Sequence, residues 1–272
     1  MLFTDSSVTT PSSHPAAAAA AHQYHDVAAV YDVLMAGVPH NLWLARIERA
    51  LRDRDKPRAH SVLDVACGTG IVTELLWRRG YKPIVGVDIS TEMIDIARTK
   101  AMGRGAPPEV RFEVQDVTAL DLGGATFDLA VSMFDSLNYV TDPDALARAF
   151  VRIHGHLNPG GVLAFDLNSL YALSHDLFTQ VHLYGPVRHR WKAHWDRETR
   201  LCRVVMEFEI DDKENGGVRE FQEVHVQRAY AIPEVKSFLE EAGFVKVEVF
   251  GNYGDRPPTT KSDRLLFVAE RS

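Results

Sequence analysis

The sequence has few cysteines, no excess of basic residues and no long apolar run. Its two cysteines, Cys67 and Cys202, lie far apart and form no CxxC motif, which argues against a disulfide framework or a cysteine-rich zinc site and favours a reducing compartment. The formal net charge is -7, so a basic nucleic-acid-binding face is not expected. No apolar run reaches the roughly 18 to 20 residues that span a bilayer. We therefore expect a cytoplasmic protein with neither a nucleic-acid nor a membrane partner.

The first 25 residues differ in composition from the rest of the chain. They are rich in Ser, Thr and Pro and include an unbroken run of alanines at 16–21. The segment lacks the basic start and the hydrophobic centre of a signal peptide. We expect residues 1–25 to form a disordered N-terminal arm.

Between residues 62 and 165, segments typical of strands alternate with segments typical of helices. The strands are expected at residues 62–65, 84–87, 110–114, 127–132 and 162–165. The helices are expected at residues 71–79, 90–102 and 142–156, after two amphipathic helices at 27–35 and 41–51. Strands that alternate with helices predict a parallel sheet with helices on both faces.

The pattern changes after residue 168. From about residue 184 to 230, apolar and polar residues alternate, with hairpin turns expected at Asp211-Asp212 and at Asn215-Gly216-Gly217. A helix at 234–241 and strands at 244–250 and 265–270 follow. The loop between these two strands is too short for a helical crossover, so they should pair antiparallel.

The predicted fold class is therefore α/β. We expect a Rossmann-like doubly wound seven-stranded sheet with an antiparallel last strand, formed by residues 26–168 and 231–272. Residues 169–230 should form an inserted antiparallel β layer that binds the substrate, because insertions over a fixed cofactor site usually set specificity.

A glycine loop follows the first expected strand, in the stretch SVLDVACGTG at residues 61–70. An acid, Asp88, ends the second strand and suits the hydroxyl groups of a ribose. The dinucleotide fingerprint needs a third glycine, but Thr73 stands at that position. Asp64 would also repel a pyrophosphate. An adenosine ligand with a cationic end removes this conflict, and S-adenosyl-L-methionine is such a ligand.

Four segments, in order and at fitting spacing, resemble class I S-adenosylmethionine-dependent methyltransferases. They are VLDVACGTG at 62–70, VGVDIS at 85–90 with Met93, VQDV at 114–117, and FDLAVSMFDSLNYV at 127–140. The resemblance covers residues 26–168 by motif and 231–270 by architecture. The FDSLNYV stretch is also similar to a loop of antibiotic amino-sugar N-methyltransferases, which often have a histidine where this chain has Tyr139.

The resemblance implies a set of cofactor-binding residues. At the methionine end it implies Asp64, Gly68 and Gly70, covered by a tyrosine of a lid helix. It implies that Asp88 binds the ribose and that Asp116 binds the amino group of the adenine. The full set is Tyr31, Asp64, Ala66, Gly68, Gly70, Asp88, Ile89, Met93, Asp116, Val117 and Met133.

Methyl transfer from a sulfonium requires alignment of the acceptor and exclusion of water. An oxygen or ammonium acceptor must also lose a proton. The candidates for this catalytic role are Tyr139, His194 and His225. The candidates for contact with a small-molecule acceptor are Trp191, Trp195 and Asn138. The histidines form no pair with metal-ligand spacing beside an acid, so no metal is expected.

Alternative interpretations stay open. The glycine loop could belong to an NAD(P)-dependent oxidoreductase, against which the missing glycine and Asp64 argue. The chain could also bind S-adenosylmethionine without catalysis. Asp64 could merely cap a helix, and Tyr31 or Tyr139 could be ordinary half-buried aromatic residues. The sequence does not choose among methylation of O, N or C, and a homodimer is an open option.

Overall fold

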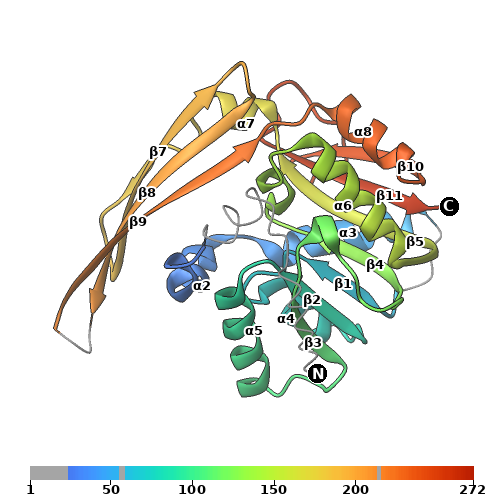
Figure 1. The fold of residues 1–272 in the computed structure, drawn as a ribbon, viewed down its shortest axis with the longest axis horizontal. Helices are drawn as coiled ribbons and strands as arrows, with labels where there is room; N and C mark the ends of the chain where they lie inside the picture. Colours follow the sequence, from blue (N-terminus) through green and yellow to red (C-terminus); the bar gives the residue numbers. More distant parts are fainter. Residues whose placement is uncertain (1–23, 55–58, 213–215) are drawn as a thin grey trace, which may run out of the picture.

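The structure is a computed structural model that describes residues 24–54, 59–212 and 216–272. A seven-stranded sheet has the order β10-β11-β5-β4-β1-β2-β3, as Figure 1 shows. Its strands are β1 (Val62–Val65), β2 (Ile84–Asp88), β3 (Val110–Val114), β4 (Phe127–Ser132), β5 (Leu157–Asn168), β10 (Phe244–Gly251) and β11 (Arg264–Arg271). Strands β1 to β5 run parallel, whereas β11 is antiparallel to both β5 and β10. The expected α/β fold class is confirmed.

Helices cover both faces of this sheet. The longer ones are α3 (His40–Arg52), α4 (Ile71–Arg78), α5 (Thr91–Gly103), α6 (Pro143–Gly155) and α8 (Ile232–Glu241). On one face Leu63 of β1 packs in a core with α6 and α8. On the other face Val62 packs in a core with α3 and α4. The alternation of side chains along the strand assigns neighbouring residues to opposite cores.

The strand order reverses between β1 and β4, which are neighbours in the sheet although β2 and β3 lie between them in the sequence. In doubly wound sheets, ligands bind at the carboxyl ends of the strands beside such a reversal. The loops after β1, β2 and β4 therefore define the site.

Two local expectations are wrong. Residues 27–37 form three short turns, η1 (Val27–Val30), α2 (Tyr31–Leu34) and η2 (Met35–Gly37), instead of a helix over 27–35. The helix breaks at Val30, whose φ of -115° and ψ of 2° are not helical. The strand expected at 162–165 is too short, because β5 starts at Leu157 and its pairing with β4 shifts register near this start.

A second, four-stranded antiparallel sheet has the order β6-β7-β8-β9. Its strands are β6 (Gln180–His182), β7 (Val187–Asp196), β8 (Leu201–Asp212) and β9 (Gly217–Arg228), after the short helix α7 (Leu170–Ser174). In Figure 1 the β8–β9 hairpin extends away from the seven-stranded sheet.

The hairpin turn expected at Asp211-Asp212 is wrong, because Asp211 pairs with Val218 and Asp212 pairs with Gly217. Both aspartates are strand residues because the hairpin closes later in the chain, and Asn215 of the other expected turn lies outside the described residues. In the part of the chain that the structure describes, no helix is long and apolar enough to cross a membrane.

Candidate active site

A cavity opens at the carboxyl ends of β1 and β2, and we call it the adenosine cavity. Its lining contains Ala66, Asp88, Ile89, Asp116, Val117 and Tyr139. Asp88 is the last residue of β2, four of the others follow strands at motif positions, and Tyr139 belongs to the turn η4 (Ser136–Tyr139) after β4. The parallel strands thus bring together residues that are far apart in the sequence.

Asp88 is held by backbone hydrogen bonds from two loops. Its Oδ2 accepts from the Gly68 amide at 2.8 Å, and its Oδ1 accepts from the Ser90 amide at 2.9 Å. Burial raises the pKa of Asp88. Each oxygen keeps a lone pair, so the carboxylate can still accept hydroxyl groups from a ligand in the cavity.

Of the expected adenine-binding residues Asp116 and Met93, only Asp116 lines the adenosine cavity. Asp116 Oδ1 accepts from the amide and the hydroxyl of Thr118, both at 2.8 Å, and Asp116 also lines the adenosine cavity. Met93 does not line it, contrary to the expectation. It is 2% exposed and turned into the core, because Ser90 accepts the Met93 amide and so fixes the start of α5.

A second cavity, the methionine cavity, lies beside the glycine loop. Its lining contains Tyr31, His40, Asp64, Ala66, Gly68 and Met133. Ala66 and Gly68 both have φ near +54°, which bends the loop tightly around the cavity. Gly70 is not part of this lining. It has φ +79° and is the N-cap residue that precedes α4 instead.

Asp64 is the most deeply buried acid of the methionine cavity, at 1% exposure. Thr73 donates its hydroxyl to Asp64 at 2.5 Å. Burial, with a contribution from Asp88, raises the pKa of Asp64 to about 7. Within the described residues neither Asp64 nor Asp88 has an ion-pair partner. A buried carboxylate and a half-buried one, both without a cation, fit a positively charged nucleoside and oppose a pyrophosphate.

Residues 24–37 lie across the site, and we call them the strap. Tyr31 of the strap lines the methionine cavity. The neighbouring Asp32 accepts the Thr69 hydroxyl of the glycine loop at 2.5 Å and forms an ion pair with Lys100 of α5. The arm expected at 1–25 lies outside the described residues except for Tyr24 and His25, which belong to the strap.

A third cavity, the acceptor cavity, lies between the strap, the loop after β4 and the four-stranded sheet. Its lining contains Tyr24, Tyr31, Phe134, Tyr139, Trp191, Phe208 and His225. Tyr139 also lines the adenosine cavity, while Tyr31 and Phe134 also line the methionine cavity. The three cavities therefore meet around these three aromatic residues.

A chain of hydrogen bonds runs along the wall of the acceptor cavity. Tyr24 donates its hydroxyl to Tyr139 at 2.7 Å, and the Tyr139 hydroxyl lies 3.0 Å from His225 Nδ1. His225 Nε2 lies 2.8 Å from Glu223 Oε2. The candidates Tyr139 and His225 are thus brought together. Tyr24 and Glu223 were not expected from the sequence, although the spacing of Glu223 and His225 places both on one face of a strand.

Three expected site residues lie elsewhere. His194 is exposed on β7, whose side chains alternate, so it points away from the face that carries Trp191. Trp195 packs in the core of the four-stranded sheet and does not line the acceptor cavity. Asn138 is fully buried, and both of its polar atoms bind the backbone, including the Asn168 amide at 2.9 Å.

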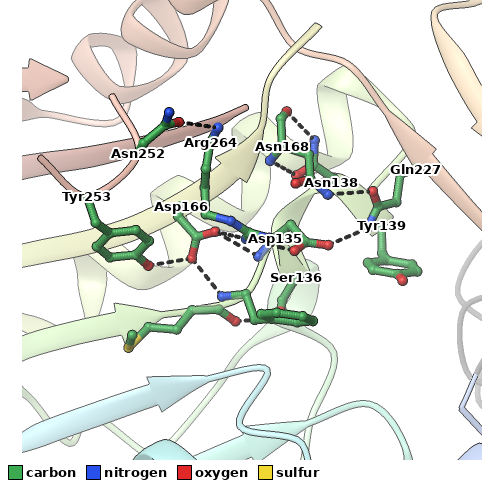
Figure 2. Close-up of polar contacts among 12 residues, drawn as sticks. Asp135, Ser136, Asn138, Tyr139, Asp166, Asn168, Gln227, Asn252, Tyr253 and Arg264 are labelled. Atoms are coloured by element: carbon green, nitrogen blue, oxygen red, sulfur yellow. Dashed lines mark hydrogen bonds and ion pairs between the residues drawn. The ribbon is translucent and has the colours of Figure 1, made fainter. Parts of the chain in front are cut away.

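The loop after β4 is fixed by a buried charged network, drawn in Figure 2. Asp166 accepts the amides of Phe134 at 2.6 Å and Asp135 at 3.0 Å, and Arg264 pairs with both Asp166 and Asp135. Asp135 also accepts from Gln227 of β9 at 2.5 Å. These bonds hold Phe134 and Asp135 in left-handed conformations, with φ of 68° and 53°, which places Phe134 at the junction of the cavities.

Comparisons with known proteins agree with this site. A methyltransferase domain family model matches residues 62–161. A protein of Geobacillus sp. (strain WCH70) that is provisionally named a methyltransferase is 29% identical over 250 residues, which span 91% of this chain and 99% of the relative. The dTDP-4-amino-2,3,4,6-tetradeoxy-D-glucose N,N-dimethyltransferase of Saccharopolyspora spinosa is 29% identical over 222 residues, 79% of this chain and 80% of that enzyme.

The fold comparison points the same way. The crystal structure of an S-adenosylmethionine-dependent methyltransferase from Clostridium acetobutylicum ATCC 824 superposes with a TM-score of 0.79 at 28% identity, and covers 92% of this chain and 99% of the neighbour. The agreement extends well beyond the matched domain, because it covers 92% of this chain. Together with the unpaired acids of the cofactor cavities, these similarities support a class I S-adenosylmethionine-dependent methyltransferase.

Proposed function

We propose that this enzyme methylates an amine nitrogen of a small cyclic molecule of the amino-sugar class. The observation that carries the proposal is the hydrogen-bonded chain from Tyr24 through Tyr139 and His225 to Glu223, at the wall of the acceptor cavity. The Saccharopolyspora spinosa relative is named for dimethylation of an amino sugar. An amine acceptor needs a proton acceptor nearby, since an ammonium group has no lone pair for attack.

The cofactor would lie across the two cavities after β1 and β2. Asp88 would accept the ribose hydroxyls, and Asp116, Ile89 and Val117 would surround the adenine. Asp64 would face the positively charged methionine end, with Ala66, Gly68 and Met133 beside it. When bound, S-adenosyl-L-methionine supplies a methyl group on a sulfonium.

The acceptor would occupy the cavity lined by the strap and the four-stranded sheet. The amine nitrogen forms the new bond to the methyl carbon with its lone pair, and the electrons of the broken carbon–sulfur bond stay on sulfur. The surplus proton of the nitrogen passes to the Tyr24 and Tyr139 hydroxyls and then to His225 Nδ1. Burial among aromatic side chains excludes water and holds the acceptor in line.

The lining of the acceptor cavity favours an uncharged ring with an amine. Most of its side chains are apolar or aromatic, including Trp191 and Phe208. Its one cation among the described residues, Arg264, already pairs with Asp135 and Asp166. An acidic group of the substrate would therefore find no free cation inside this cavity.

Other expectations rest on the sequence. We propose that the inserted layer at 169–230 sets acceptor specificity, because β7, β8 and β9 supply much of the acceptor cavity. A cytoplasmic location, the absence of a nucleic-acid partner and a homodimer stay predictions.

The experiment is a methyl-transfer assay with matched acceptors. Purified enzyme and S-adenosylmethionine would be incubated with amino sugars, free and as nucleotide conjugates, and with the same sugars carrying a hydroxyl in place of the amine. We expect mass spectrometry to detect methyl gain in the amines only. Methyl gain in the hydroxyl sugars alone, or in none of the acceptors while calorimetry detects cofactor binding, would refute the proposal.

A further inference from the structure

Glu223 of β9 connects the strap to the acceptor cavity through one buried carboxylate. Its Oε1 accepts the amides of Asp26 at 2.7 Å and Val27 at 2.9 Å. Its Oε2 accepts the Tyr24 amide at 3.0 Å and lies 2.8 Å from His225 Nε2. Glu223 is 7% exposed. Burial alone would raise its pKa, but the hydrogen bonds from His225 and from the strap amides outweigh burial and lower the pKa of Glu223.

An ionised carboxylate fixes the direction of the whole hydrogen-bonded chain. A carboxylate only accepts, so neutral His225 must carry its hydrogen on Nε2 and present the lone pair of Nδ1 to Tyr139. Tyr139 then donates to His225 and accepts from Tyr24, as the 2.7 Å contact between the hydroxyls allows. In this direction, the oxygen of Tyr24 can accept a proton from an amine in the cavity.

The same carboxylate holds the N-terminal end of the strap. Two of the strap amides that donate to Glu223, those of Asp26 and Val27, lie at the start of η1, where a helix offers them no backbone acceptor. Farther along the strap, Asp32 binds the glycine loop through Thr69. The strap is thus tied to the acceptor sheet at one point and to the cofactor loop at another.

We infer that Glu223 is a positioning residue for methyl transfer, which closes the strap and sets the His225 tautomer that accepts the proton. This inference rests on the proposed N-methylation. Glu223 touches neither reactant and acts through His225 and through the strap. The groups that face His225 are Glu223 from its own strand, Tyr139 from η4 and Tyr24 from the strap.

Glu223→Gln keeps the size of the side chain but turns one acceptor into an NH₂ donor. Facing His225 Nε2, this donor favours the other tautomer, with the hydrogen on Nδ1. His225 could then no longer accept from Tyr139. We expect kcat to fall by about 100-fold, as for the loss of general base catalysis, while the KM for S-adenosylmethionine changes little.

The direct test is the tautomer of His225, measured by nitrogen NMR on ¹⁵N-histidine-labelled enzyme, with its signals assigned from their loss in His225→Asn. We expect the hydrogen on Nε2 in the wild type and on Nδ1 in Glu223→Gln. The same tautomer in both proteins would overturn the inference. Tyr139→Phe breaks the chain but keeps the Glu223 bonds, so it should lower kcat without changing the tautomer.

Glu220→Gln provides the matched control, because Glu220 is an exposed acid on the same strand. It should leave kcat and the tautomer unchanged. An equal kcat for Glu223→Gln and wild type would also overturn the inference. If the wild type methylates no amine, the proposed function fails, whereas the NMR result still decides whether Glu223 sets the tautomer.

Discussion

Asp64 is buried on β1 and Asp88 is half-buried at the end of the adjacent strand β2, and the charge of Asp88 helps to raise the pKa of Asp64. Neither carboxylate has an ion-pair partner among the described residues. Such a pair of acids destabilises the empty site and stabilises a bound cation. The charge of the site therefore selects a sulfonium nucleoside over a dinucleotide, whose pyrophosphate both acids would repel.

Removal of the Asp88 carboxylate should weaken cofactor binding. Asp88→Ala loses charged hydrogen bonds to the ribose, which are worth about 1.5 to 3 kcal/mol. Isothermal titration with S-adenosylmethionine would measure the loss. Asp95→Ala is the control, since Asp95 is an exposed acid on α5. Equal affinity of Asp88→Ala and wild type would refute the ribose assignment.

The pH dependence of stability should reveal Asp64. Its folded pKa of about 7 lies above the ordinary value of 3.8, so the folded state binds more protons than the unfolded state between these values. The contribution of Asp64 to stability therefore falls as the pH rises from about 4 to 7, and the cost is fully present above pH 7.

The substitution Asp64→Asn should remove this loss of stability, and the new amide oxygen can still accept a hydrogen bond from the Thr73 hydroxyl. We expect the free energy of unfolding of the cofactor-free enzyme to rise by about 1 to 3 kcal/mol at pH 8 and to change little at pH 4. Urea unfolding at both pH values would measure it. The same variant should bind S-adenosylmethionine more weakly. A loss of stability at pH 8 would contradict the assigned pKa.

The sequence predicts the cofactor site well because its residues follow strands at fixed spacing. Asp64 and Asp88 lie near the carboxyl ends of short apolar strands, and parallel pairing brings such ends together. Local sequence patterns are therefore sufficient to place these residues at the edge of the sheet where the cofactor binds. Met93 is an exception, since the rotation of its helix is decided by the Ser90 cap and by packing.

The acceptor site depends on contacts between distant segments, which local patterns do not encode. Tyr24 follows a low-complexity arm, yet its amide binds Glu223, 199 residues away. Asp166 and Arg264 pair across neighbouring strands, and each taken alone is an unremarkable charged residue in an apolar strand. The one feature of the acceptor site that the sequence could have indicated is the shared face of Glu223 and His225, because residues two apart on a strand point to the same side.

Gly70→Ala should destabilise the enzyme for two separable reasons. A Cβ at Gly70 would lie 3.1 Å from Phe112 and 3.3 Å from Ala97, and the backbone has φ +79°. We expect a loss of about 2 to 4 kcal/mol from crowding and strain together. Gly105→Ala is the control, since Gly105 has φ +70° with nothing within 4 Å of its Cβ. Equal losses in urea unfolding would show that crowding contributes nothing.

Arg264→Ala should be the most destabilising of these substitutions. Arg264 is the cation between two buried carboxylates, Asp135 and Asp166, and those acids shape the loop that carries Phe134. Breaking a buried ion pair by removal of one partner costs about 3 to 5 kcal/mol, because the remaining charge is uncompensated. Urea unfolding at pH 7 would measure the loss, with Arg197→Ala at an exposed site as control. Burial raises the pKa of Asp135, so acid protonates this orphaned carboxylate. The deficit in stability relative to wild type should therefore shrink at pH 4, and a deficit independent of pH would contradict the charge-based explanation.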